Sequence, residues 1–100
     1  MKTLLQSIIL IKDVTFTPEP ITHSIEKGAE LIYKMGGCIR PPIVERAPSE
    51  GMTFKYKLIS GQFAMTCALL AREKYGIESI NVFISESEGD DFAEALTLFS

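Results

Sequence analysis

The amino-acid sequence predicts an α+β fold in which one small mixed sheet packs against about three helices. β-branched apolar runs alternate with segments of helical periodicity, glycines follow two of those segments, and the element order is strand, helix, strand, strand, helix, strand, helix. The 100 residues are 46% hydrophobic and 23% charged, a composition typical of a folded globular protein. We therefore expect a single domain over residues 1–100.

The first half of the chain predicts a strand, a helix and a second strand. Residues 8–16 (IILIKDVTF) are β-branched and apolar, and two prolines follow them. In residues 22–35 apolar side chains recur at helical spacing, and Gly36 and Gly37 suit the end of a helix. Residues 43–45, which two prolines precede, are predicted to form a short strand at the edge or entry of the sheet.

The second half predicts two more strands and two helices. Residues 53–59 alternate aromatic or apolar side chains with lysines, which predicts a half-exposed strand in a hairpin with residues 43–45. Residues 62–75 are apolar nearly all round, as in a buried helix. Residues 79–85 (SINVFIS) predict a strand, and residues 91–99, after an acidic run, predict an amphipathic helix.

The charge and the cysteine count argue against several classes of protein. Ten basic and 13 acidic side chains give a net charge of −3, whereas a domain that holds DNA by its phosphates alone is usually basic. Two cysteines are too few for a disulfide framework. The apolar runs, such as residues 8–11, are far shorter than the roughly 20 residues of a membrane helix. We therefore expect a cytoplasmic protein without a membrane partner.

The junction between the strand at residues 53–59 and the buried helix is the best candidate site. Ser60, Gly61 and Gln62 form a turn of small and polar residues, and the first N–H groups of the helix after it can bind a phosphate or a carboxylate. Gly61 allows close backbone approach, and the Ser60 hydroxyl is interpreted as a helix N-cap or an anion ligand. The alternative is an ordinary strand-to-helix turn.

Four cations are candidates to supply positive charge near this turn. Arg40, Arg46, Lys55 and Lys57 can gather on one side of the predicted hairpin. Arg40 and Lys57 join the three turn residues in the predicted phosphate- or nucleotide-binding site. Tyr56 lies between the two lysines, a pattern that also suits binding of a nucleic-acid strand.

The remaining polar and sulfur-containing residues identify no catalytic residue and no metal site. Cys38 is interpreted as an apolar filler or, if Arg40 lowers its pKa, as a reactive thiol, and Cys67 as buried packing. His23 is the only histidine, so one chain has neither a Ser-His-Asp triad nor a His-rich metal site. The acidic run at residues 86–91 is interpreted as a solvated loop rather than a cation site.

The order of these pieces resembles the ParB/sulfiredoxin superfamily, and most closely the N-terminal domain of ParB-type partition proteins. The resemblance covers about residues 8–96, through IILIKDV, the helix ending KMGG, RPPIVERA, YKLISGQFAMTCALLA and INVFI with its acidic tail. It implies a ParB-like fold and association with nucleic acid or with a nucleotide, which Mg²⁺ can accompany.

The Gly-x-x-Arg box of this superfamily is only partly present. Gly61 matches its glycine, but Phe63 and Ala64 stand where arginines are expected. A guanidinium offers a fixed charge and a bidentate fork for phosphate, and Phe and Ala offer neither. Residues 37–40 also resemble the Gly-Gly-Cys-His-Arg motif of sulfiredoxins, but they precede a strand instead of joining a strand to a helix.

Two functions are consistent with this sequence. The first is a ParB-like, DNA-associated domain that binds nucleotide or nucleic-acid phosphate at the three turn residues, Arg40 and Lys57. The absent arginines argue against nucleotide hydrolysis or nuclease-type chemistry. The second is a non-enzymatic module whose apolar surface binds a second copy or a partner protein. Arg40 or a lysine pointing into the turn favours the first function, whereas closure of the turn by Phe63 favours the second.

Overall fold

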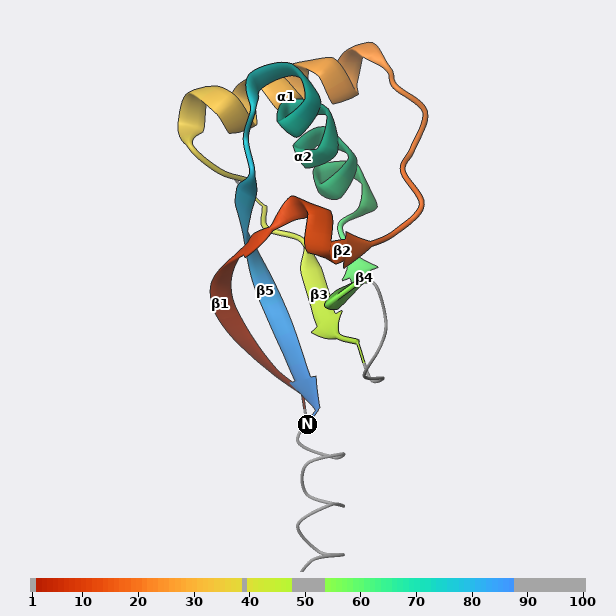
Figure 1. Cartoon of the computed structure of the whole chain (residues 1–100), viewed down its shortest axis with the longest axis vertical. Coiled ribbons are helices and arrows are strands. Elements are labelled where there is room, and N and C mark those ends of the chain that lie inside the picture. The colour runs from red at the N-terminus through yellow and green to blue at the C-terminus, as the bar shows by residue number, and fades with distance from the viewer. Residues whose placement is uncertain (1, 39, 48–53, 88–100) are drawn as a thin grey trace, which may run out of the picture.

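The computed structural model describes residues 2–38, 40–47 and 54–87 (Figure 1). These residues form an α+β domain, as predicted, with one mixed sheet and two α-helices. In chain order the elements are β1 (Lys2–Leu10), the 3-10 helix η1 (Ile11–Asp13), β2 (Val14–Thr15), α1 (His23–Met35), β3 (Ile43–Arg46), β4 (Tyr56–Ser60), α2 (Gln62–Tyr75) and β5 (Ser79–Ser87).

The five strands lie in the order β1-β5-β3-β4-β2. β1 pairs with β5 and β3 with β4 in antiparallel fashion, so the predicted hairpin is confirmed. The β3–β5 and β2–β4 pairs are parallel. β3 pairs with β5 only at Ile43 and Val44, whereas β1 pairs with β5 along its whole length. The far ends of β1 and β5, residues 2–4 and 85–87, therefore extend as a two-stranded arm (Figure 1).

The prediction of a single strand over residues 8–16 is wrong. β1 ends at Leu10, η1 carries the chain across the sheet, and β2 pairs with β4 at the opposite edge. The Ile11 side chain is 1% exposed, and its backbone N–H donates to the Glu78 carbonyl at 2.9 Å. The apolar run thus contains the end of one strand, a buried crossing and a second short strand.

The ends of both helices follow from their local sequence. The Thr22 hydroxyl accepts a hydrogen bond from the Ile25 N–H at 3.2 Å and caps α1. Gly36 ends α1 and Gly76 ends α2, and both have the left-handed backbone that glycine adopts without steric cost. The third helix predicted from the sequence, residues 91–99, lies outside the described residues. No helix in the described part of the chain is long and apolar enough to cross a membrane.

The two helices pack against each other at one end of the sheet (Figure 1). Near the middle of α1, a Cβ atom on Gly28 would lie only 2.3 Å from Cys67 Sγ, so the helices approach closely there. Near their C-terminal ends, the Tyr33 and Tyr75 rings stack with centroids 4.6 Å apart. This packing positions the cavity described below.

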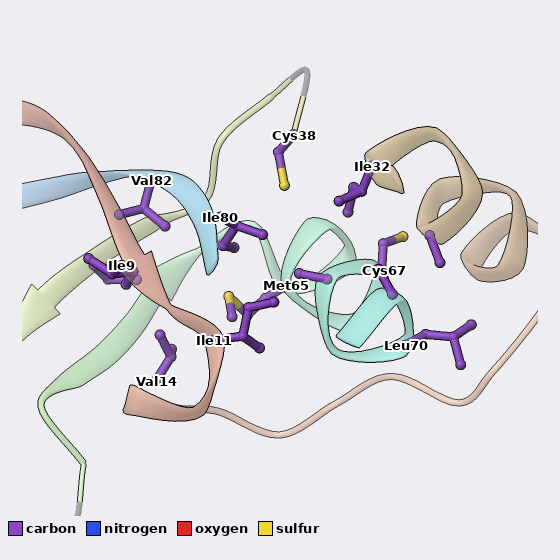
Figure 2. Close-up of a cluster of buried hydrophobic side chains, with 14 of the residues drawn as sticks. Ile9, Ile11, Val14, Ile32, Cys38, Met65, Cys67, Leu70, Ile80 and Val82 are labelled. Atoms are coloured by element: carbon purple, nitrogen blue, oxygen red, sulfur yellow. The ribbon is translucent and has the colours of Figure 1, made fainter. Parts of the chain in front are cut away.

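The hydrophobic core lies between the sheet and the helices (Figure 2). α2 is the buried helix that the sequence predicts, since its residues 65–68, 70 and 71 are all buried. The buried apolar residues are Ile9, Ile11, Val14, Ile25, Ala29, Ile32, Cys38, Val44, Met65, Cys67, Ala68, Leu70, Ala71, Ile80, Val82 and Ile84.

Candidate functional site

β4 passes into α2 through Gly61, which has φ 93° and ψ 38° and is the helix N-cap. Ser60 is the last residue of β4, so its interpretation as the N-cap is wrong. A Cβ on Gly61 would lie 2.8 Å from Pro42 Cα, which explains why glycine is needed at this turn. Where a Cβ would project from Gly61, the group that approaches closely is therefore the backbone of Pro42 and not a ligand. Gly61 has no side chain to cap α2, so among the described residues the first N–H groups of α2 stay available to an anion.

Two polar side chains of α2 hold the connection between β2 and α1. Thr66, which is 1% exposed, donates to the Gln62 carbonyl at 2.8 Å and accepts from the Glu19 N–H at 3.0 Å. The Gln62 side-chain amide donates to the Thr17 carbonyl. The side chain of Gln62 therefore stabilises the fold, and the group of Gln62 that can bind a ligand is its backbone N–H.

A cavity of about 260 Å³ lies between α1, the segment that connects α1 to β3, and the first turns of α2. Ile32, Cys38 and Cys67, labelled in Figure 2, lie around it. Of the described residues that line it, Arg40 alone is charged, and the lining is otherwise apolar. The lining residues are Gly28, Leu31, Ile32, Gly37, Cys38, Arg40, Phe63, Ala64 and Cys67.

Arg40 is the predicted site residue that the structure brings to this cavity. It is exposed, and within the described residues it makes no hydrogen bond or ion pair. Ser60 and Gly61 lead into α2 beside the cavity without lining it. Lys57 lies in β4 opposite Glu45 and does not line it either. Among the described residues, Arg40 is thus the predicted cation that lines the cavity.

Two of the four cations predicted to form a basic patch are engaged with carboxylates. Lys55 Nζ lies 3.9 Å from Asp13 Oδ2, and the Arg46 guanidinium pairs with Glu86. These carboxylates come from segments far away in the sequence, so the neutralisation was not evident from the local pattern. The hairpin therefore offers a polyanion less positive charge than the sequence suggests.

Phe63 forms part of the cavity wall and leaves the cavity open. It is 47% exposed, whereas Met65, two residues further along α2, is 0% exposed and belongs to the core. Phe63, and not Met65, is therefore positioned to contact a ligand or a partner. Both features that we expected to discriminate the two functions, Arg40 and Phe63, meet at this cavity.

Asn81 fixes the segment that carries Arg40, and sequence reasoning did not single it out. Its Oδ1 accepts from the Cys38 N–H at 2.7 Å, and its Nδ2 donates to the Cys38 carbonyl at 2.9 Å. A Cβ on Gly37 would lie 2.6 Å from Asn81 Oδ1, so glycine lets the segment lie close to β5. The sequence feature that could have pointed to Asn81 is its position as the one amide side chain in the strand segment SINVFIS.

The two cysteines are free and buried, in agreement with their interpretation as packing residues. Burial raises the pKa of the Cys38 thiol to about 11, and burial also raises the pKa of the Cys67 thiol. Both groups are therefore protonated near neutral pH. This contradicts the alternative that Arg40 activates Cys38 as a nucleophile.

Raising the pH from about 9 to about 11 is expected to reduce the free energy of unfolding through Cys38. The thiol loses its proton near pH 9 in the unfolded chain but only near pH 11 in the folded protein, so the unfolded state binds fewer protons between these values. Urea unfolding at several pH values measures this loss. Cys38→Ala should show a shallower decline than the wild type, and identical declines would contradict the shift.

The described residues contain no group of three or more His, Cys, Asp or Glu side chains placed to hold a metal ion. Glu30 is engaged with Lys34 at 2.6 Å, and this hydrogen bond lowers the pKa of the Glu30 carboxyl. His23 is exposed at the start of α1. Most of the acidic run at residues 86–91 lies outside the described residues.

The fold is that of ParB N-terminal domains. No protein-family model matches the sequence, and no curated protein matches it. The chain is similar to the C-terminally truncated chromosome-partitioning protein ParB from Caulobacter crescentus, whose structure contains CTP-γ-S. The TM-score is 0.61 at 16% identity, over 84% of this chain and 46% of that one.

A Pnob8-like ParB-N domain is similar as well, with a TM-score of 0.55 and 16% identity over 95% of this chain and 35% of that one. The present chain therefore spans less than half the length of either protein. At this identity the similarity shows the fold, and it confirms the ParB-like architecture expected from the sequence.

Proposed function

We propose that this domain binds a nucleotide, with its phosphates at Arg40 and the N-terminus of α2 and its nucleoside part in the cavity between α1 and α2. The observation that carries the proposal is Arg40, the charged residue among the described ones that line this apolar cavity, whose side chain is exposed and has no partner among the described residues. An apolar cavity with few polar groups is the usual form of a small-molecule site.

The phosphate subsite combines a side chain with a helix end. The first turn of α2 contributes Phe63 and Ala64 to the cavity lining, so its uncapped N–H groups lie beside the same space. These N–H groups and the positive end of the helix dipole favour an anion. Arg40 adds the charge that Phe63 and Ala64 lack at the positions of the superfamily's arginines.

The comparison with solved structures supports the ligand class. The ParB protein from Caulobacter crescentus has the same fold and is complexed with CTP-γ-S. A nucleoside triphosphate, with or without Mg²⁺, is therefore the first ligand to test. We propose binding without hydrolysis, because arginines at positions 63 and 64 would be needed to stabilise charge that develops on the phosphate.

Nucleic acid is the less favoured ligand. Lys55 and Arg46 are paired with carboxylates, and Lys57 faces Glu45 across the β3–β4 pair. A nucleic-acid strand needs several uncommitted cations along its backbone.

Calorimetric titration of the purified protein with CTP, ATP and GTP, each with and without Mg²⁺, tests the proposal. Arg40→Ala is expected to weaken binding of the preferred nucleotide roughly 10- to 100-fold, because a hydrogen bond to a charged group contributes about 1.5–3 kcal/mol. Lys12→Ala is the matched control, since Lys12 is an exposed cation outside the cavity. Phe63→Arg should tighten binding by restoring a guanidinium at α2.

Two results would contradict the proposal. One is the absence of a heat signal and of a ligand-induced rise in melting temperature for every nucleotide at millimolar concentration. The other is equal affinity in the wild type and in Arg40→Ala. Binding of oligonucleotides that Lys57→Ala weakens and Arg40→Ala does not would favour the hairpin and nucleic acid instead.

A further inference from the structure

Within the part of the chain that the structure describes, β1 is an edge strand with one row of unpaired backbone groups, since β5 pairs with it on one side only. Hydrogen-bonded pairs alternate along an antiparallel ladder, and the Ile11 N–H donates to the Glu78 carbonyl one step beyond the last pair of the ladder. The odd-numbered residues of β1 therefore bond to β5. The residues whose N–H and C=O groups face the open edge are Lys2, Leu4, Gln6, Ile8 and Leu10.

Over residues 3–10 the open edge is mostly apolar and lacks the features that normally discourage pairing. Ile8 is 73% exposed, Leu4 48% and Leu5 43%. Natural edge strands avoid association through lysine, proline or bulges. Lys2 at the start of β1 is its one charged residue, residues 3–10 contain no charge and no proline, and the β1–β5 register is regular throughout. Such a strand favours a further strand at its edge.

We propose that β1 pairs antiparallel with β1 of a second copy around a two-fold axis at Gln6, which joins the two sheets into one. In this register the whole of Lys2–Leu10 overlaps with its counterpart. Even-numbered residues meet even-numbered residues, so the open-edge groups of one copy bond to those of the other. This pairing does not rest on nucleotide binding, because β1 contributes nothing to the cavity lining.

The sequence of β1 complements itself about this axis, as an isologous interface requires. Leu4 and Ile8 are equally distant from Gln6 and lie on the same face of the strand, so Leu4 meets the partner's Ile8 on both sides of the axis. The two Gln6 amides meet at the axis, where each has a donor and an acceptor. A register centred on Ile8 would place Leu4 opposite Lys12, beyond the end of the partner strand, and shorten the overlap.

The shape of the domain permits this arrangement. The helices lie beyond the Leu10 end of β1, and the arm extends away from them (Figure 1). Antiparallel pairing therefore places the helices of the two copies at opposite ends of the joined strands. The arm gains two further strands, which matters because a two-stranded ribbon is marginally stable on its own.

Sedimentation equilibrium of the full chain, from micromolar to millimolar concentration, tests the proposal. The wild type is expected to approach twice the chain mass of 11.1 kDa. Gln6→Pro removes an N–H from the open edge and none from the β5 ladder, so it should give a monomer with an unchanged circular dichroism spectrum. Ile8→Lys should also give a monomer. Ile21→Lys, which alters another exposed isoleucine outside the sheet, should remain a dimer.

Oxidative cross-linking tests the register. Hydrogen-bonded antiparallel pairs have Cα atoms about 5.5 Å apart, within the range of a disulfide. Gln6→Cys should therefore form a cross-linked dimer on a non-reducing gel, and Ile21→Cys should not.

Three results would overturn the proposal. The first is a wild type that stays at the chain mass at millimolar concentration. The second is a dimer that survives both Gln6→Pro and Ile8→Lys, since it must use another surface. The third is a dimer that forms only after removal of residues 88–100, which would assign the open edge to that segment of the same chain.

Discussion

Replacing Gly61 with alanine is expected to lower the free energy of unfolding by about 3 kcal/mol, the largest effect we predict for one methyl group in this domain. Two costs combine at this position. The backbone has φ 93°, which L-residues rarely adopt, and the new Cβ would lie 2.8 Å from Pro42 Cα and 2.9 Å from Pro42 Cβ. Pro42 is a rigid backbone neighbour at the entry of β3, so the contact is not relieved by a side-chain rotation.

Gly36→Ala separates these two costs. Gly36 has φ 79°, but a Cβ there would meet nothing within 4 Å, so only the backbone cost of about 1 kcal/mol remains. Urea unfolding of the wild type and both variants measures the difference. Equal losses in the two variants would show that the turn does not press against Pro42 as described.

Gly28→Ala is expected to cost about 2 kcal/mol because it separates the two helices. Its Cβ would lie 2.3 Å from Cys67 Sγ, which is closer than packed atoms allow. Cys67 is 2% exposed, so its side chain has little room to move away. Both residues line the cavity, and the same variant should weaken nucleotide binding by reshaping its wall.

A double-mutant cycle with Cys67→Ala tests this packing. Removal of the sulfur relieves the contact, so Gly28→Ala should cost at least about 1 kcal/mol less in the Cys67→Ala background than in the wild type. Additive losses would contradict the close approach of α1 and α2 at this point.

Most of the fold could be predicted because its signals are local. Thr22 and Gly36 delimit α1, and alternation of side chains marks the hairpin strand. The crossing at Ile11 could not be predicted, because a β-branched apolar residue suits a strand and a buried crossing equally well. Only the burial of Ile11 and its hydrogen bond to Glu78, which lies far along the chain, distinguish a crossing from a strand.

The candidate site likewise has one part that the sequence predicts and one part that it does not. The turn at Gly61 is contiguous in the sequence and was predicted from residue types. The cavity is assembled from α1, the segment around Arg40 and α2, so no local pattern outlines it. Asn81 was missed because its role depends on a contact with Cys38 that spans 43 positions.

The crossing at η1 also has a consequence for the order in which the sheet assembles as the chain is made. β1 and β2 are synthesised before the other strands of the sheet, yet Val14 pairs with Tyr56, and Leu10 pairs with Ser79. Each edge of the sheet must therefore wait for a strand synthesised much later, and β3–β4 is the only strand pair between neighbours in the described chain. Such distant pairing slows folding. β1 therefore remains without its β5 partner until residues 79–87 have been synthesised, and its apolar side chains stay uncovered by that partner for this time.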